Sequence, residues 1–163
     1  MATVEVTFPP LPAHVRTARL VATAVARRSG MDESLLDEVR LAVGEACSRA
    51  VEAHRRHCPS RPIRVALCDD GERFEVVVTD AAPADADVEP GTGDSASAES
   101  PAGRNGTASG AAAVAAPGGG APLQLPAGVG LAVITGLADD VRISPAPDGT
   151  SVAMSWKRRS AIA

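Results

Sequence analysis

Large aromatic side chains are almost absent from this sequence. Phe, Trp and Tyr together make up 2% of the 163 residues, and Tyr does not occur, although 45% of the residues are hydrophobic. Most of the buried surface must therefore come from Ala, Val, Leu and Ile. A chain of this length has the size of one domain. We expect a single domain over residues 1–163 with a largely aliphatic core.

Long apolar runs and paired cysteines are lacking as well. No stretch approaches the roughly 20 apolar residues that a membrane-spanning helix needs, and the first residues do not resemble a secretion signal. Three cysteines in unrelated contexts form no disulfide framework and suit a reducing compartment. We expect a cytoplasmic protein without a membrane partner.

Neither sign of charge dominates. The chain has 16 Lys and Arg against 20 Asp and Glu, which gives a net charge of -4. A nucleic-acid interface usually needs a surplus of clustered positive charge. We therefore expect no nucleic-acid partner.

The spacing of apolar residues predicts strands and helices in a definite order. We expect a strand over residues 2–8, helices over 12–28 and from Asp32 to about His54, strands over 63–68 and 74–79, a short helix over 128–138 opened by a glycine turn, and strands over 141–144 and 151–157. This order favours an α+β two-layer sandwich, in which helices cover one face of a mixed, mostly antiparallel sheet.

Residues 84–125 differ in composition from the rest of the chain. They are rich in Ala, Gly, Pro, Ser and Asp, and they show no periodicity of apolar residues. Such a segment buries too little surface to offset the entropy lost on ordering. We expect a long disordered loop inserted into the domain.

Three clusters of residues stand out along the predicted elements. Glu45 and Arg49 lie one turn apart in the second helix, Asp80 ends a strand, and residues 128–130 (Gly-Val-Gly) open a helix. In this order and separation they resemble the N, G1 and G2 boxes of ATPases with the Bergerat (GHKL, HATPase) fold. The resemblance covers nearly the whole chain and is closest to the anti-sigma factor serine kinases of the RsbW and SpoIIAB type.

The second helix resembles the N box of these kinases. Residues 41–50 read LAVGEACSRA, where the family has L-A-V-x-E-A-x-T-N-A. The resemblance implies that Glu45 is the general base. Arg49 replaces the magnesium-binding Asn, and a guanidinium has no lone pair with which to bind a metal. This variant is similar to the actinobacterial, UsfX-like branch, while the residues alone also allow a surface pair of Glu and Arg.

The strand that ends at Asp80 resembles the G1 box. The sequence TDAAP over residues 79–83 keeps the Asp of the family pattern D-x-G-x-G and lacks its glycines. The resemblance implies that Asp80 accepts a hydrogen bond from adenine. The final DGTSV, with Thr150 and Ser151, is similar to the element that supports this Asp. The residues alone also allow a loop carboxylate and a plain hairpin turn.

The third cluster resembles the G2 box. Residues 127–134 read AGVGLAVI, and the family has G-x-G-L-x-I/V. The resemblance implies that the backbone at Gly128, Val129, Gly130 and Leu131 faces the phosphates of ATP or ADP. Residues 84–125 occupy the place of the family's lid, although a low-complexity insertion is the favoured interpretation.

The first helix has a short motif that resembles the family's partner-binding pattern. Ala18-Arg19-Leu20 resembles an A-R-[VL] pattern whose Arg contacts both a sigma factor and an anti-anti-sigma protein. The resemblance implies that Arg19, with Arg16 beside it, binds partners. Ordinary solvated arginines are the alternative.

A zinc site is a further alternative for the second helix. Cys47, His54, His57 and Cys58 lie near one another in the sequence, but they lack the spacing of a zinc site and form no C-x-x-C pair. We expect no metal ligand among them.

Our leading hypothesis for function follows from the resemblance. It is an anti-sigma factor, expected to be a homodimer, that sequesters an alternative sigma factor and is released by a STAS-domain anti-anti-sigma partner. ATP or ADP is the implied cofactor, and Arg49 argues against magnesium. A working serine/threonine kinase is the second hypothesis, and a degenerate ATPase-like scaffold is the third.

Overall fold

The computed structural model describes residues 2–82 and 127–158, with the backbone alone for 127–129. Its elements are β1 (Ala2–Phe8), α1 (Pro12–Arg28), α2 (Glu33–His57), β2 (Ile63–Asp69), β3 (Arg73–Asp80), α3 (Ala127–Leu137), β4 (Asp140–Ala146) and β5 (Gly149–Lys157). Their order agrees with the order predicted from the sequence. The loop expected over residues 84–125 lies outside the described residues.

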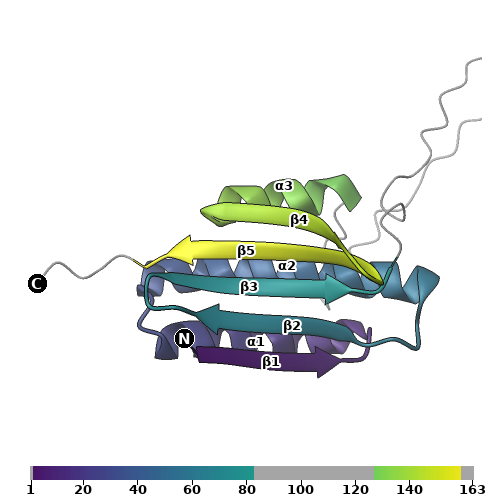
Figure 1. Cartoon of the computed structure of the whole chain (residues 1–163), viewed down its shortest axis with the longest axis horizontal. Helices are drawn as coiled ribbons and strands as arrows, with labels where there is room; N and C mark the ends of the chain where they lie inside the picture. The colour runs from purple at the N-terminus through teal and green to yellow at the C-terminus, as the bar shows by residue number, and fades with distance from the viewer. Residues whose placement is uncertain (1, 83–126, 159–163) are drawn as a thin grey trace, which may run out of the picture. The chain divides into compact units, whose positions relative to one another are not determined.

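The strands form one five-stranded sheet in the order β1-β2-β3-β5-β4. All four neighbouring pairs are antiparallel, so the described sheet is fully antiparallel instead of mixed. The helices lie behind one face of the sheet, and the other face carries none of the described helices (Figure 1). The predicted α+β two-layer sandwich is therefore confirmed. Because β5 lies between β3 and β4, the end of β3 at Asp80 is opposite Thr150.

The core lies between the sheet and the helices. Alternate residues of the two central strands are completely or almost completely buried there: Phe74, Val76, Val78, Val152, Met154 and Trp156. The core is mostly aliphatic, and at one end of it the rings of Phe74 and Trp156 lie 6.5 Å apart. The indole nitrogen of Trp156 donates a hydrogen bond to the carbonyl oxygen of Leu137, which ties β5 to the end of α3.

Helices α1 and α2 pack closely because their contact is built from small residues. Ala18, Ala22 and Ala26 follow one face of α1 at helical spacing and are buried against the core. At the start of α2, Asp32 accepts a hydrogen bond from the amide of Ser34 and so acts as the N-cap of this helix. None of the described helices is long and apolar enough to span a membrane.

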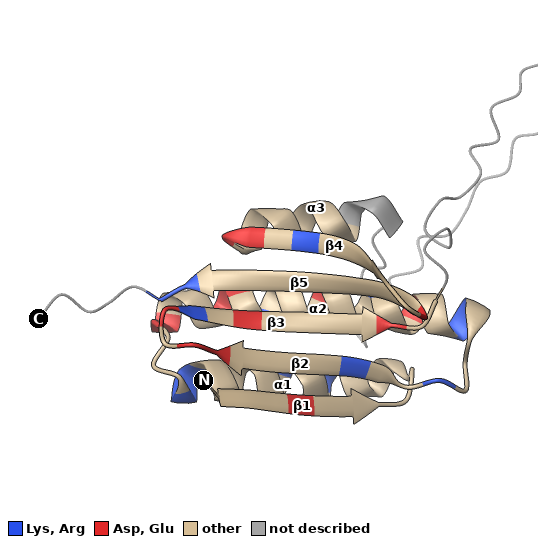
Figure 2. Cartoon of the chain, viewed as in Figure 1, with Lys and Arg blue, Asp and Glu red and all other residues tan. Residues whose placement is uncertain are grey.

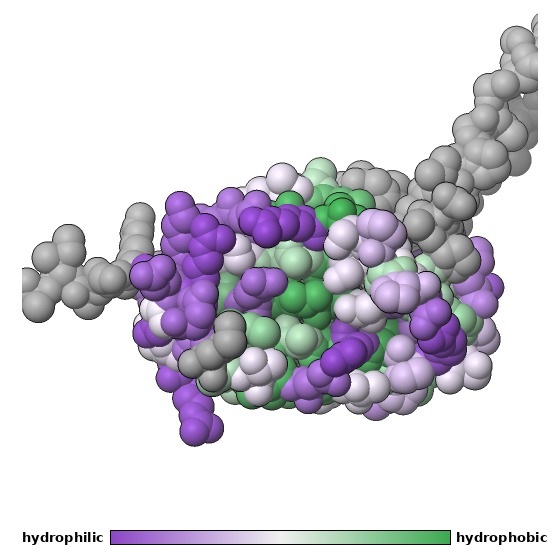
Figure 3. Space-filling view, viewed as in Figure 1, coloured by the Kyte–Doolittle hydropathy of each residue, from purple (hydrophilic) through white to green (hydrophobic). Residues whose placement is uncertain are grey.

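The helix-free face of the sheet has an apolar centre. Both signs of charge occur along β2, β3 and β4 (Figure 2), while apolar side chains gather in the middle of this face (Figure 3). One row of paired residues crosses all five strands there, in the order Glu5, Ala66, Val77, Ala153 and Arg142. We call it the central row. It has a carboxylate at one end and a guanidinium at the other.

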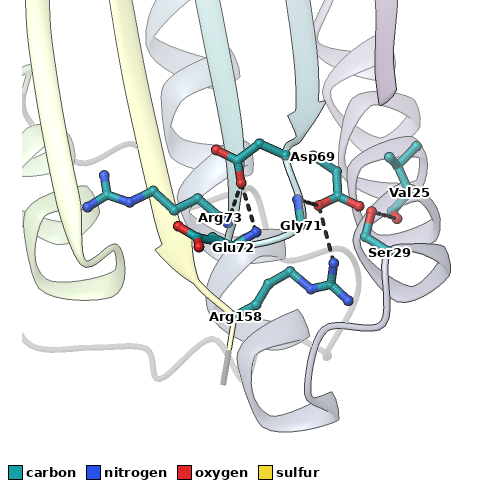
Figure 4. A network of polar contacts seen from close by, with 8 residues as sticks. Val25, Ser29, Asp69, Gly71, Glu72, Arg73 and Arg158 are labelled. Atoms are coloured by element: carbon teal, nitrogen blue, oxygen red, sulfur yellow. Dashed lines mark hydrogen bonds and ion pairs between the residues drawn. The ribbon is translucent and has the colours of Figure 1, made fainter. Parts of the chain in front are cut away.

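A polar network closes the sheet at the end opposite Asp80 (Figure 4). Gly71 has a φ of 91°, which only glycine adopts easily, and its amide donates to Asp69. Arg158, after β5, also donates to Asp69, at 3.4 Å. The amides of the next turn residues bind Asp70 and lower the pKa of its carboxyl group. The tight turn between β2 and β3 therefore also binds Arg158, the residue that follows β5.

Candidate functional site

Asp80 is fixed by the start of β5. Its side chain is 3% exposed, and its Oδ1 accepts a hydrogen bond from the amide of Ala82 at 2.9 Å. The backbone amide of Thr150 binds the same carboxylate. A Cβ atom on Gly149 would lie 1.9 Å from the carbonyl oxygen of Asp80, so this approach of the strands requires glycine. The geometry holds a carboxylate on the helix side of the sheet.

Arg49 of α2 reaches this carboxylate. Its Nη1 lies 3.6 Å from Oδ2 of Asp80, and its side chain is only 10% exposed. The residue is therefore part of a buried ion pair and not of an exposed pair with Glu45. Burial raises the pKa of Asp80 above its ordinary value, while the amide of Ala82 and the charge of Arg49 act in the opposite direction. Desolvation of the carboxylate thus outweighs its attraction to the guanidinium.

His54 is a site residue whose role the sequence analysis missed. It is fully buried, and its Nε2 accepts a hydrogen bond from the amide of Ala81 at 2.7 Å. The ring proton must then be on Nδ1, which donates to the carbonyl oxygen of Arg61 at 2.9 Å. Both ring nitrogens are used, so neither is left for a metal. The signal in the sequence was a histidine on the apolar stripe of α2, which includes Val43 and Ala50.

Glu45 faces the first turns of α3. A Cβ atom on Gly130 would lie 3.5 Å from Oε2 of Glu45, and the glutamate side chain is half-buried. The predicted glycine turn before this helix is wrong, because α3 already begins at Ala127 and residues 128–130 are helical. The amides at the start of a helix have no partner within the helix. A ligand can bind such amides without a separate turn before the helix.

The structure gathers most of the predicted nucleotide-site residues at one place. Glu45 and Arg49 share α2 and reach Gly130 and Asp80 respectively. Thr150 is buried beside Asp80, but Ser151 pairs with Thr79 and its side chain lies on the helix-free face. This separation follows from the alternation of side chains along a strand. Leu131 packs against the core, and the side chain of Val129 is outside the described part of the structure.

The two predicted partner-binding residues lie on α1. Arg16 is exposed, and Arg19 is half-buried. The stem of Arg19 lies against Gly44 of α2, because a Cβ atom at Gly44 would be 2.8 Å from its Cδ. The helix α1 contains no acidic residue, so its surface is basic.

Comparisons with known proteins agree with this arrangement. The family model of the histidine kinase-like ATPase domain matches residues 8–156. No curated protein matches the chain. A solved structure, the RsbU and RsbW domains of Rv1364c from Mycobacterium tuberculosis, is similar with a TM-score of 0.62 and 18% sequence identity.

That alignment covers 99% of this chain but 34% of the other chain, so the present chain corresponds to about a third of it. At this level of identity the likeness concerns the fold. The family model, by contrast, spans α1 to β5 and includes Glu45, Asp80 and Gly130. The chain therefore belongs to the histidine kinase-like ATPase domain family.

Proposed function

We propose that this protein is an anti-sigma factor of the RsbW type, in the UsfX-like branch. It holds an alternative sigma factor and releases it when a STAS-domain anti-anti-sigma protein binds instead. The observation that carries this proposal is the buried pair of Arg49 and Asp80. The pair joins the position expected for magnesium to the position expected for adenine, which favours partner binding over phosphoryl transfer. The RsbW domain in the similar solved structure is consistent with it.

The residues fit a nucleotide better than they fit magnesium. A buried carboxylate at Asp80 suits an amino group of adenine, and the helix start at residues 128–131 suits phosphate oxygens. Arg49 supplies a positive charge but no ligand atom for a metal. ATP or ADP would thus bind in this site with the guanidinium nearby. Bound nucleotide would then shift the balance between the two protein partners.

A serine/threonine kinase is the second candidate function. One observation favours it: the carboxylate of Glu45 points at the backbone of Gly130, where phosphates would lie. Glu45 would act there as the base that takes the proton from an acceptor serine. We rank this function second because phosphoryl transfer relies on a metal to neutralise the phosphates, and position 49 holds arginine.

The helix-free face supports a homodimer. The central row of Glu5, Ala66, Val77, Ala153 and Arg142 is apolar in the middle and has opposite charges at its ends. Within one chain these charges already pair, Glu5 with Arg64 and Arg142 with Asp140. A twofold axis parallel to the strands, placed between two facing sheets, would reverse the row in the second copy. Each glutamate would then face an arginine, and the small apolar residues would pack together.

The central test is binding to a defined set of sigma factors. The chain is co-expressed with each alternative sigma factor of its source organism in turn, and complexes are separated by size-exclusion chromatography. Binding to at least one, with displacement by a STAS-domain protein, supports the proposal. Arg19→Ala should weaken this complex, while Arg28→Ala, an exposed arginine on the same helix, should not. Failure of every sigma factor to bind overturns the anti-sigma proposal.

The kinase alternative has its own assay. The purified chain is incubated with labelled ATP, magnesium and the STAS-domain protein, and phosphate on the acceptor serine is measured over time. We expect little or no transfer. Transfer with repeated turnover, abolished by Glu45→Gln, would place the kinase first.

A further inference from the structure

Gly44 occupies an unfavourable place for glycine. It lies inside α2, the longest of the described helices, where glycine is less favourable than alanine. Its backbone does not need glycine, because the described glycines with positive φ are Gly30 and Gly71. The reason for glycine at position 44 must therefore be the space that a side chain would occupy, and not the backbone conformation.

The space at Gly44 is filled by Arg19. A Cβ atom at Gly44 would lie 2.8 Å from Cδ of Arg19 and 3.5 Å from both its Cγ and its Nε. The first of these distances is shorter than carbon atoms tolerate. The aliphatic stem of Arg19 therefore crosses directly over the backbone of α2, and the missing side chain at Gly44 is the slot that admits it. The guanidinium is thereby held near the line where the two helices meet.

The surface around this slot is basic and apolar. Leu20, the next residue on α1, is 60% exposed, and Leu41, one turn before Gly44 on α2, is 50% exposed. Arg16 is exposed one turn before Arg19. The helix α1 has no acidic residue of its own, and the pair that its arginines make with α2 is at its far end, where Arg27 binds Glu33. The chemistry matches a protein segment that offers a carboxylate to Arg19 and an apolar side chain to the leucines.

We propose that Gly44 is a positioning residue for partner binding. It holds the guanidinium of Arg19 where an acidic, partly apolar segment of the sigma factor meets α1, and the volume at position 44 sets the affinity. This inference rests on the proposed anti-sigma function. A methyl group at position 44 pushes aside the flexible stem of Arg19 and leaves the helix backbones in place.

The decisive variant is Gly44→Ala, because stability and affinity should change in opposite directions. Alanine improves helix propensity, so the melting temperature should stay equal or rise. Affinity for the sigma factor selected by co-expression should fall roughly tenfold, as expected when a central interface arginine is displaced. Gly136→Ala is the matched control: Gly136 is also helical, and a Cβ atom there meets nothing within 4 Å. It should leave affinity unchanged.

A double-mutant cycle separates positioning from general effects. In an Arg19→Ala background, Gly44→Ala should change affinity by less than about twofold, because no guanidinium is left to displace. Arg19→Met keeps most of the stem and removes the charge, so it should lose affinity with little change in melting temperature. Equal loss from Gly44→Ala in both backgrounds overturns the inference, and so does a fall in melting temperature that parallels the fall in affinity.

An NMR measurement tests the slot without a partner. In the full chain, nuclear Overhauser effects between the α-protons of Gly44 and the δ-protons of Arg19 are expected, and Gly44→Ala should shift the Nε–Hε signal of Arg19. Absence of these effects overturns the inference. If no sigma factor binds while the Overhauser effects are still present, the proposed function is overturned, and with it the role of Gly44 in binding. Weakening by Arg19→Ala but not by Gly44→Ala defeats this inference alone.

Discussion

The guanidinium of Arg49 lies 3.6 Å from the carboxylate of Asp80, and both side chains are almost completely buried. This contact joins the middle of α2 to the end of β3. Around it, His54 binds the amide of Ala81, and Gly149 lets β5 begin against Asp80. The carboxylate that would recognise a base is therefore already engaged by the protein itself.

Replacement of Arg49 by asparagine should strengthen nucleotide binding. The change frees one oxygen of Asp80 and provides an amide oxygen, which can bind a metal. We expect affinity for ATP with magnesium to rise about tenfold, which corresponds to the loss of a competing contact worth about 1.4 kcal/mol. Titration with a fluorescent ATP analogue, with magnesium and with EDTA, measures this. Weaker binding than that of the wild type would contradict the prediction.

The contributions of Arg49 and Asp80 to the free energy of unfolding should depend strongly on each other. Removal of one member of a buried ion pair leaves an uncompensated charge and costs about 3–5 kcal/mol. Arg49→Met should cost less than this, because the carboxyl group of Asp80, whose pKa burial already raises, can take up a proton. Asp80→Asn should approach the full cost, because the guanidinium of Arg49 cannot lose its proton when this carboxylate is removed. Urea unfolding of both variants and of the double variant gives the comparison.

The double variant decides how these costs arise. Arg49→Met combined with Asp80→Asn should be more stable than Asp80→Asn alone, because the guanidinium is then removed together with its carboxylate. Simple addition of the two single costs would mean that the residues do not interact.

Ionisation of Asp80 should lower stability as the pH rises. The native-state pKa of Asp80 lies above 3.8, mainly because of burial, so the folded state binds this proton more tightly than the unfolded state does. The stabilisation is complete below pH 3.8 and is lost as the pH rises through the native pKa. The free energy of unfolding of the wild type, relative to Asp80→Asn, should therefore fall across that interval.

Two measurements check this pH dependence. Urea unfolding of both proteins at a series of pH values gives the difference in stability, and carboxyl carbon chemical shifts of Asp80 give its titration directly. A native pKa below 3.8 would mean that the hydrogen bond from Ala82 and the charge of Arg49 together outweigh desolvation, contrary to our expectation.

A charge in the central row should separate the proposed homodimer. Val77 lies in the middle of this row, between Ala66 and Ala153. Val77→Lys would bring two ammonium groups into the apolar contact, so sedimentation equilibrium should detect monomers at concentrations where the wild type is dimeric. Glu75→Lys is the control for where the new charge is placed, because Glu75 is on the same strand and face as Val77 but outside the central row. An unchanged mass for Val77→Lys would exclude this interface.

The sequence predicted the elements well because their signals are local. Asp32 caps α2 and Gly71 turns the chain between β2 and β3, and both act within a few residues. The face of Ser151 was also predictable, since adjacent residues on a strand point to opposite sides. The partner of Arg49 was not, because a helical Glu and Arg one turn apart suggest each other. Whether the side chain of Arg49 pairs with Glu45 or with Asp80 depends on how α2 packs on the sheet.

The contact between Arg19 and Gly44 was beyond local analysis for a similar reason. A glycine inside a helix can be seen in the sequence, but the side chain that needs the space at this glycine belongs to another helix. The histidine at position 54 gave an intermediate case: its place on the apolar stripe indicated burial, and only the approach of β3 shows what it binds.

The position of β5 between β3 and β4 has a consequence for synthesis on the ribosome. Among the described strands, the one that completes the middle of the sheet is translated last. A nascent chain that ends before Gly149 has β3 as an open edge and lacks the side chains of Val152, Met154 and Trp156 in its core. Ribosome-bound chains halted at that point should be cut readily by protease and should depend on chaperones. Resistance should appear in one step, once residues 149–157 have emerged.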